Sequence, residues 1–261
     1  MLPTVDFCGL KLTRLLIGAN PFGGYSHQNP ERDKAMREYY TGERIKATWD
    51  RALKAGINTM VTNNETPHVV EAVTGYLKAG GRLQWIAQIN GRTKADVCKS
   101  IDEAVAIGCK AIYLHGAMVD DAFIHKDGDA IKTWCDHARS HKIPAGVAGH
   151  SPQAHLWVNG LGFADFHAVC FFNCGSLHSG KGNKFRLADM KLAVDAIHAI
   201  KKPCIAYKIM GAGRIDAHMA FEYAFVNIKP GDVVNVGMYR GDKNDMVEEN
   251  IAMVQTILGG A

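Results

Sequence analysis

Two histidines, His115 and His150, come at the ends of apolar runs of this chain. A neutral imidazole at such a position can act as a general acid or base, polarise a carbonyl group or ligate a metal. The two runs are consecutive, so both rings could reach one ion or one substrate. A structural role is the alternative for each: His115 as a hydrogen-bonded core side chain, and His150 as the cap of a helix that begins near Ser151.

A carboxylate and an amine follow two further apolar runs. Glu65, in TNNETPH, could complete a two-histidine, one-carboxylate set that holds a divalent metal with open positions, either with the two histidines above or with His68. The residues ETP are equally an ordinary helix start. Lys208, in IAYKIMGAGR, lies among apolar residues, where burial would favour the neutral amine that Schiff-base or base chemistry needs. Alternatively, this lysine extends past a helix to solvent or pairs with Glu65.

Amide and hydroxyl side chains stand at most of the remaining run ends. Amides both donate and accept hydrogen bonds, so a ring of them suits a hydroxyl-rich small molecule. The side chains that we predict to bind substrate are Asn20, Asn64, Asn90, Asn173 and Tyr239.

Arginines follow the last two runs, Arg214 in GAGR and Arg240 in GMYRG. Loop amides, a helix N-terminus and an arginine commonly hold a phosphate after the last strands of a barrel. Glycine is also the least strained turn residue, so the glycines alone indicate nothing. The two arginines therefore favour a phosphate or carboxylate contact.

These side chains require a scaffold that brings eight run ends together. Each run is rich in Val, Ile, Leu and aromatic residues, ends in a polar or glycine cluster and precedes a helix-period segment, which is the pattern of a (β/α)8 TIM barrel. The predicted strands are residues 14–18, 58–62, 85–90, 111–115, 145–150, 168–173, 205–210 and 233–238. The predicted helices are residues 44–54, 68–78, 94–107, 129–141, 187–200, 217–226 and 245–258, with Thr93 and Asp216 as N-caps and Gly56, Gly80 and Gly108 just past helix ends.

Two further segments complete the predicted architecture. Residues 5–12 are two short extended pieces around Cys8 and Gly9, which predicts an N-terminal β-hairpin at the amino-terminal end of the barrel. Residues 24–43 show no clear period, and so long a connection predicts a functional lid or a mobile segment. With 261 residues, 47% of them hydrophobic and 21% charged, the chain fits one barrel, and we predict a single domain over residues 1–261.

The composition limits the partners. The net charge is +4 and the longest basic block is Lys201 and Lys202, so we expect a small-molecule substrate and no nucleic acid. No stretch of about 18 apolar residues and no signal-peptide pattern occurs, so we expect no membrane partner. Seven dispersed cysteines without a CxxC motif fit reduced thiols and a cytoplasmic location. No pattern indicates the oligomeric state.

Short segments in the predicted order carry a family resemblance. They are LIG with PFGG after the hairpin, AGIN before the second strand, YLH in the fourth, FN in the sixth, IAY with Gly211 and Gly213 in the seventh, and EEN in the last helix. Together they resemble the aldo-keto reductases over nearly the whole barrel. The resemblance implies a barrel in which an Asp, a Tyr, a Lys and a His at the ends of strands two to four reduce a carbonyl with NADPH. His115 is the residue that matches the histidine.

The resemblance also implies where a dinucleotide would bind. Arg240 stands close to the basic residue that meets the 2′-phosphate, and Glu249 and Asn250 resemble the pair near the adenine. Met246 stands where a second basic residue is expected. These residues, with Arg214 as a phosphate contact, are the predicted cofactor-binding set.

The other three catalytic positions of that family are changed here. The aspartate position falls on Val61 or Thr62, residues 62–73 hold no tyrosine, and the third strand, WIAQIN, holds no lysine. Without the tyrosine proton donor and its two partners, the reduction step has no evident agent. Lys208 and His150 stand on the same rim instead, which argues for changed chemistry.

We therefore predict an aldo-keto-reductase-like barrel enzyme that acts on a small carbonyl or sugar-derived substrate by acid/base lyase, isomerase or hydrolase chemistry. The predicted catalytic residues are His115, His150, Glu65 and Lys208. The first three are also the predicted ligands of a divalent metal, should the chemistry be metal-assisted.

Two alternatives remain open. One is an NADPH-dependent reductase with a relocated proton donor, either Tyr25, Tyr207 or Tyr239. The other is a non-catalytic barrel that binds a ligand in the same place.

Overall fold

The computed structural model describes residues 1–172 and 185–259 and contains a closed barrel of eight parallel strands. Neighbouring strands follow chain order, and the last strand closes the barrel by pairing with the first. The barrel strands are β3 (Leu15–Gly18), β4 (Thr59–Asn63), β5 (Gln84–Ile89), β6 (Ala111–Leu114), β7 (Ala145–Gly149), β8 (Phe166–Cys170), β9 (Cys204–Tyr207) and β10 (Val233–Gly237). The TIM barrel predicted from the apolar runs is confirmed.

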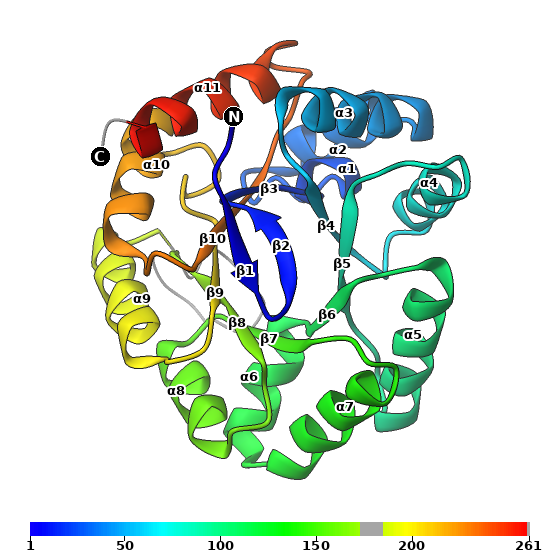
Figure 1. Cartoon of the computed structure of the whole chain (residues 1–261), viewed down its shortest axis with the longest axis vertical. Helices are drawn as coiled ribbons and strands as arrows, with labels where there is room; N and C mark the ends of the chain where they lie inside the picture. Colours follow the sequence, from blue (N-terminus) through cyan, green and yellow to red (C-terminus); the bar gives the residue numbers. More distant parts are fainter. Residues whose placement is uncertain (173–184, 260–261) are drawn as a thin grey trace.

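Helices form a ring around this barrel (Figure 1). They are α1 (Asn20–Gly23), α2 (Pro30–Tyr39), α3 (Gly42–Ala55), α4 (Pro67–Lys78), α5 (Lys94–Ile107), α6 (Gly116–His125), α7 (Gly128–Ser140), α8 (Pro152–Leu161), α9 (Leu187–Ala199), α10 (Ala217–Asn227) and α11 (Met246–Gly259). The predicted caps are present: Thr93 forms a capping box with Asp96, and the Asp216 side chain accepts from the backbone of Met219. Gly56 and Gly108 end their helices with φ of 113° and 115°, a conformation that favours glycine.

Strand side chains alternate between two hydrophobic clusters. Leu16, Ile86 and Phe166 belong to the cluster that fills the barrel interior, whereas Ile17 and Trp85 pack between the strands and the helices. Because apolar side chains fill the interior, polar chemistry is confined to the ends of the barrel.

The hairpin predicted for residues 5–12 is confirmed as the antiparallel pair β1 (Thr4–Phe7) and β2 (Leu10–Thr13). Phe7 and Leu12 are fully buried within the interior cluster, and the Phe7 ring lies 5.1 Å from that of Phe166. The hairpin therefore covers the centre of the barrel at one end (Figure 1), which leaves the other end for a ligand.

α2 lies in a connection where no helix was predicted. Residues 24–43, expected to lack regular structure, contain α2, which begins after Asn29 and has Pro30 at its first position. The Asn29 side chain accepts a hydrogen bond from the backbone N of Arg32 at 2.7 Å. This helix buries only Met36, so the apolar period by which helices are recognised is almost absent from its sequence.

Three further differences lie on the site side of the barrel. α1 and α6 were not among the predicted helices, and α8 was considered only as the helix that His150 could cap. β8 ends at Cys170 rather than at residue 173, because the long apolar run FHAVCFF offers no clear boundary, and Asn173 lies outside the described residues. β9 ends at Tyr207, so Lys208 follows the strand instead of lying on it. No helix within the described ranges is both long and apolar enough to cross a membrane.

Candidate active site

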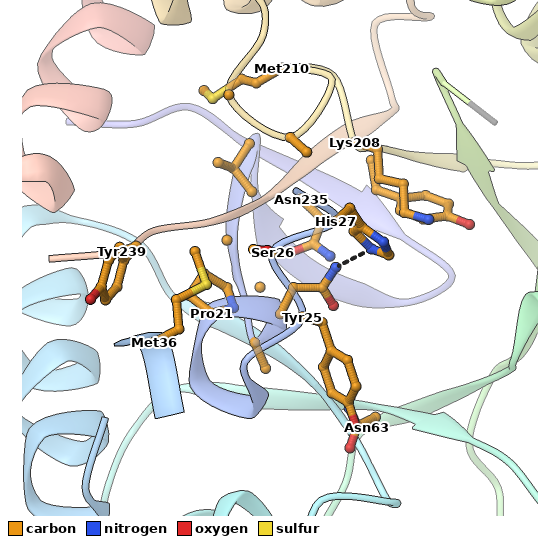
Figure 2. Close-up of a pocket in the computed structure, with 18 of the residues that line it drawn as sticks. Pro21, Tyr25, Ser26, His27, Met36, Asn63, Lys208, Met210, Asn235 and Tyr239 are labelled. Carbon is orange, nitrogen blue, oxygen red and sulfur yellow. Dashed lines mark hydrogen bonds between the residues drawn. The ribbon is translucent and has the colours of Figure 1, made fainter. Parts of the chain in front are cut away.

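A cavity of about 550 Å³ opens at the carboxyl ends of the barrel strands. Six of the residues predicted for the site line it, and they come from six different strand ends: Asn20, Glu65, His115, His150, Lys208 and Tyr239. Figure 2 shows His27 and Lys208 on one side of this cavity and Tyr239 on the opposite side. The cavity lies where the barrel fold places ligands.

His150 is held by a buried carboxylate. Its Nδ1 lies 2.8 Å from Oδ2 of Asp120 on α6, and its backbone N donates to Oδ1 of the same residue at 3.1 Å. The two side chains are 8% and 9% exposed. An ionised carboxylate only accepts hydrogen bonds, so Nδ1 carries a proton and the lone pair of the neutral ring is on Nε2. His150 therefore has the tautomer of a general base oriented by an acid.

The His150 ring packs against the first residue of α6, which is glycine. A β-carbon at Gly116 would lie 2.8 Å from Cε1 and 3.0 Å from Nδ1 of His150. No real β-carbon tolerates the shorter distance, so glycine here is a condition for the His150–Asp120 pair.

His115 has the opposite tautomer. It is the N-cap of α6, and its Nδ1 accepts a hydrogen bond from the backbone N of Ala117 at 3.2 Å. Because an accepting nitrogen bears no proton, the neutral ring carries its proton on Nε2. His115 is thus a structural cap whose Nε2 bears the proton of the neutral ring, so the cap and the predicted chemical role are not exclusive.

Lys208 and His27 form a second polar group of the cavity. Burial and then the positive charge of Lys208 lower the pKa of His27 to about 4, so this imidazole is neutral near pH 7. Nδ2 of Asn20 lies 3.4 Å from Nε2 of His27. His27 and Lys208 both have left-handed backbone conformations, with φ of 56° and 58°, and Ala212 in the next loop has φ of 59°. Such angles are strained for residues with a β-carbon and often occur at functional sites.

Glu65 lines the cavity and is positioned by two asparagines. Asn90 donates a short hydrogen bond from Nδ2 to Oε1 of Glu65. The backbone N of Asn90 donates to Oδ1 of Asn64 at 2.9 Å, and Nδ2 of Asn64 donates to the Asn90 carbonyl at 3.1 Å. Asn64 and Asn90 were predicted to bind substrate, but in the described structure they bind each other and do not line the cavity. Their amides join two loops instead.

Asn235 on β10 also lines the cavity, although the sequence did not single it out. Its Oδ1 is buried and has no hydrogen-bond partner among the described residues. A β-carbon at Gly18 would lie 2.8 Å from this oxygen, so the glycine makes room for the amide. A buried, unsatisfied amide oxygen at a cavity wall is suited to a ligand hydroxyl.

The segment before α2 covers part of the cavity. Nε2 of Gln28 donates to the Ala212 carbonyl at 2.8 Å, and Nη2 of Arg214 donates to the His27 carbonyl at 3.5 Å. Arg32 forms a very short ion pair with Asp242. These contacts tie residues 27–32 to the loops after β9 and β10, so the predicted lid is an anchored cover.

Tyr239 lies beneath the cover. The Arg32 guanidinium lies 4.6 Å from the centre of its ring. Burial raises the pKa of Tyr239, so the hydroxyl stays protonated at neutral pH. The hydroxyl is therefore available as a hydrogen-bond donor on the side of the cavity away from His27.

The predicted cofactor residues do not line the cavity. Arg214 stacks on Phe185, with 3.7 Å between the guanidinium carbon and the ring centre. Arg240 donates to the Asn244 carbonyl at 3.0 Å and to Oγ1 of Thr48 at 3.2 Å, so its guanidinium is engaged within the protein. Glu249 pairs with Lys243, and Asn250 is buried in α11.

The predicted metal ligands are not gathered into one set. Within the part of the chain that the structure describes, the ligating atoms of His115, His150 and Glu65 are not all within 4.8 Å of one another. His115 also presents Nε2 with a proton, which leaves no lone pair for an ion unless its cap is broken. His68 is engaged elsewhere, with Nε2 2.8 Å from the Phe22 carbonyl.

Several cavity residues were missed by sequence reasoning. Tyr113 donates from its hydroxyl to Oε1 of Gln88 at 3.1 Å, and burial raises its pKa. Both alternate inward on their strands, which is a signal that could have been used. His27 lies in a connection without a period, and Asp120 lies 30 residues before its partner, so neither had a local signal.

Comparisons with known proteins find similar folds but no similar sequence. No family model and no curated protein matches the chain. A provisionally assigned aldo-keto reductase from Pseudomonas aeruginosa superposes with a TM-score of 0.69 at 17% identity, over 98% of this chain and 94% of that one. Orotidine 5′-monophosphate decarboxylase from Methanocaldococcus jannaschii gives 0.59 at 12% identity over 93% and 99%.

3-Hexulose-6-phosphate synthase from Salmonella typhimurium gives 0.59 at 13% identity over 95% and 99% of the two chains. Sequence identities this low support a shared fold only. The resemblance read from the sequence is confirmed at that level: the chain has the TIM-barrel fold that these enzymes, the aldo-keto reductase among them, share with it.

Proposed function

We propose that this barrel is an enzyme that moves protons on a small polyhydroxylated carbonyl compound, by elimination or isomerisation. The observation that carries the proposal is the pair of different Nδ1 contacts of the cavity histidines, the Asp120 carboxylate for His150 and the Ala117 backbone N–H for His115, which give the two rings opposite tautomers. His150, oriented by Asp120, has its lone pair on Nε2, and His115 has its proton on Nε2. A base and an acid at the ends of adjacent strands are the minimum for transferring a proton between neighbouring atoms.

In this mechanism, Nε2 of His150 takes a proton from the carbon next to the substrate carbonyl. The buried Asp120 carboxylate stabilises the imidazolium that forms. Nε2 of His115 donates to the carbonyl oxygen in an isomerisation, or to the departing hydroxyl in an elimination, and the proton held by His150 restores the neutral His115 ring through solvent at the end of the cycle. The charge of Lys208 favours the enolate that develops between the two steps.

The remaining polar groups of the cavity suit substrate hydroxyls. The buried Oδ1 of Asn235 accepts, Asn20 offers a donor beside His27, and Tyr239 offers one on the opposite side of the cavity. A neutral His27 adds a further hydrogen-bonding group without adding charge. The mixture of amides and hydroxyls favours a sugar-derived ligand over an apolar one.

The test is solvent exchange with a panel of aldoses, ketoses, sugar acids and keto sugars in D₂O, followed by ¹H NMR. We expect deuterium at the carbon next to the carbonyl, or an eliminated product, with at least one compound. His150→Ala should abolish exchange while the protein stays folded. A wild-type protein that binds a compound of the panel without exchange or product would overturn the proposal in favour of a binding barrel.

The NADPH-dependent reductase remains a second candidate because the cavity extends to Asp242 and Met246, beside the start of α11. Tyr25, Tyr207 and Tyr239 all line it and are the available phenolic donors. Quenching of tryptophan fluorescence by NADPH, with oxidation of the cofactor by an aldehyde, would favour this candidate. The engagement of Arg240 with Asn244 and Thr48 argues against it.

We also propose that the cavity can bind a divalent metal. His150 and Glu65, which both line the cavity, would hold it through Nε2 and a carboxylate oxygen. Such an ion would act as a Lewis acid toward the substrate carbonyl. Elemental analysis of the purified protein and of His150→Ala would test it.

A further inference from the structure

A group of three side chains lies on the outer ring of helices, away from the cavity. Asp102 on α5 faces His137 on α7 and His141, the residue that caps the end of α7. Nε2 of His137 lies 2.8 Å and Nε2 of His141 2.7 Å from the same oxygen, Oδ1 of Asp102. The ligating atoms of all three lie within 4.8 Å of one another.

This arrangement differs from the other helical ion pairs of the described surface. Most of those pairs join one acidic and one basic side chain, as Asp121 and His125 do, and Asp136 meets Lys132 and Arg139 through different oxygens. Here, one carboxylate oxygen meets two imidazoles, and the imidazole side chains are 30% and 32% exposed. The centre of the group therefore has one carboxylate oxygen and two ring nitrogens.

The spacing is that of a helical chelate. Histidines four residues apart lie on one face of a helix, and this spacing brings two imidazoles onto one zinc ion in metalloproteases. A carboxylate from a neighbouring element commonly completes a three-ligand site with water in the fourth position. With metal–ligand bonds of about 2.0–2.1 Å, the nitrogen–oxygen edges of a tetrahedral site are about 3.3 Å. The observed 2.7–2.8 Å would need to lengthen by roughly half an ångström, which side-chain rotation allows.

We propose that Asp102, His137 and His141 form a binding site for a divalent transition-metal ion of the Zn²⁺ class, which joins α5 to α7. On binding, each neutral ring gives up its Nε2 proton to solvent and takes one on Nδ1, so both Nε2 lone pairs and one Asp102 oxygen bind the ion. The ligand set of imidazole and carboxylate suits Zn²⁺ and Ni²⁺. The site shares no residue with the cavity lining, so it is independent of the proposed function.

The test is titration of chelator-treated, dialysed protein with Zn²⁺ by calorimetry, with thermal unfolding in parallel. We expect one site per chain in this region and, at about 100 times its Kd, a rise in Tm of roughly 5–10 °C. His141→Gln and Asp102→Asn should each weaken this binding by more than about tenfold, the least that losing even an outer partner of a metal ligand costs.

Two matched variants serve as controls. His125→Gln removes a surface histidine that also pairs with an aspartate, and Cys98→Ser removes a thiol one turn before Asp102. Both should bind Zn²⁺ like the wild type. If His137→Gln/His141→Gln binds Zn²⁺ as tightly as the wild type, or if Zn²⁺ leaves the Tm of the wild type unchanged, the three side chains are only a hydrogen-bonded link between the helices. Loss of Zn²⁺ binding in His150→Ala alone would also overturn the proposal, by assigning the ion to the cavity.

Discussion

The Asp120 carboxylate lies 2.8 Å from Nδ1 of His150, and the backbone N of His150 donates to the other oxygen of the same carboxylate. Asp120→Asn can keep the backbone contact through its amide oxygen, but its NH₂ group would favour a proton on Nε2. The base would then have the wrong tautomer. We expect kcat to fall by about 10²–10⁴-fold with a small change in KM, as for other histidines that lose a carboxylate partner.

The measurement is the D₂O exchange assay together with ¹⁵N NMR of the imidazoles. The NMR spectrum reports the tautomer of His150 whether or not a substrate is known. An unchanged tautomer in Asp120→Asn would show that the carboxylate does not orient the base.

Two substitutions of His115 separate its cap from its chemistry. Asparagine is among the preferred N-cap residues, so His115→Asn should keep α6 stable, whereas His115→Ala should lose about 1 kcal/mol of unfolding free energy. Both should lose the proton-donor step, with activity reduced by about 10²–10⁴-fold. Urea denaturation and the exchange assay check the two effects. Full activity in His115→Asn would limit this histidine to its structural role.

Gly116→Ala tests whether the space beside the base matters. The new β-carbon would lie 2.8 Å from Cε1 of His150, so the ring must move away from Asp120. We expect activity to fall by at least about tenfold, since small displacements of a catalytic group are costly. Gly75→Ala is the matched control, because this helical glycine has open space around its β-carbon position; it should gain up to about 1 kcal/mol and keep its activity. Equal activity of the two variants would contradict the packing argument.

The ion pair between Arg32 and Asp242 predicts how the cover is anchored. Arg32→Ala should raise KM and speed hydrogen exchange in residues 25–39, while global stability changes by less than about 1 kcal/mol. Arg51→Ala is the control, since Arg51 and Glu248 form a pair of similar exposure, 29% and 40% against 27% and 42%, between α3 and α11. Hydrogen–deuterium exchange of residues 25–39, measured by mass spectrometry in both variants, tests this prediction. A cover as slow to exchange in Arg32→Ala as in the control would mean that other contacts hold it.

A buried histidine pair predicts sensitivity to acid. Nδ1 of His155 on α8 lies 3.1 Å from Nδ1 of His167 on β8, and burial lowers the pKa of His155 from 6.5 to about 4 and that of His167 well below its usual value. Between these values the unfolded chain binds more protons than the folded one, so stability falls as pH drops from 6.5 toward 4. The loss is on the order of 3 kcal/mol for His155 alone.

Urea unfolding of the wild type, His155→Gln and His125→Gln at several pH values measures this effect. His155→Gln should show a shallower loss of stability with acid, and His125→Gln, whose histidine is exposed, should follow the wild type. Parallel pH curves for all three proteins would remove the histidine pair as the cause.

The parts of the fold that the sequence predicted are those with local signals. Thr93 and Asp96 indicate the start of α5. The apolar runs around Ile86 and Ile112 indicate buried strands, because a strand buried on both faces has a continuous apolar sequence. α2 was missed because it packs through Met36 and charged side chains, not through an apolar stripe. The buried strands were therefore predicted better than the connections between them.

The same difference separates the site residues. His115 and His150 could be found because strand ends meet at one rim in this fold. Asp120 could not be found from the sequence, because only the packing of α6 against β7 brings it to His150. Asn64 and Asn90 look like ligand contacts in the sequence, and only the structure shows that the Asn64 side chain satisfies the backbone of Asn90 while the Asn90 side chain donates to Glu65.

Three of the six non-glycine residues with positive φ in the described chain, His27, Lys208 and Ala212, line the cavity. Each left-handed conformation costs roughly 1–2 kcal/mol, which glycine would recover in part. A laboratory selection for heat resistance alone would therefore be expected to collect substitutions at these positions. The variants that it enriched would be more robust proteins with a damaged binding site, and their locations would mark the boundary of the cavity without any knowledge of the substrate.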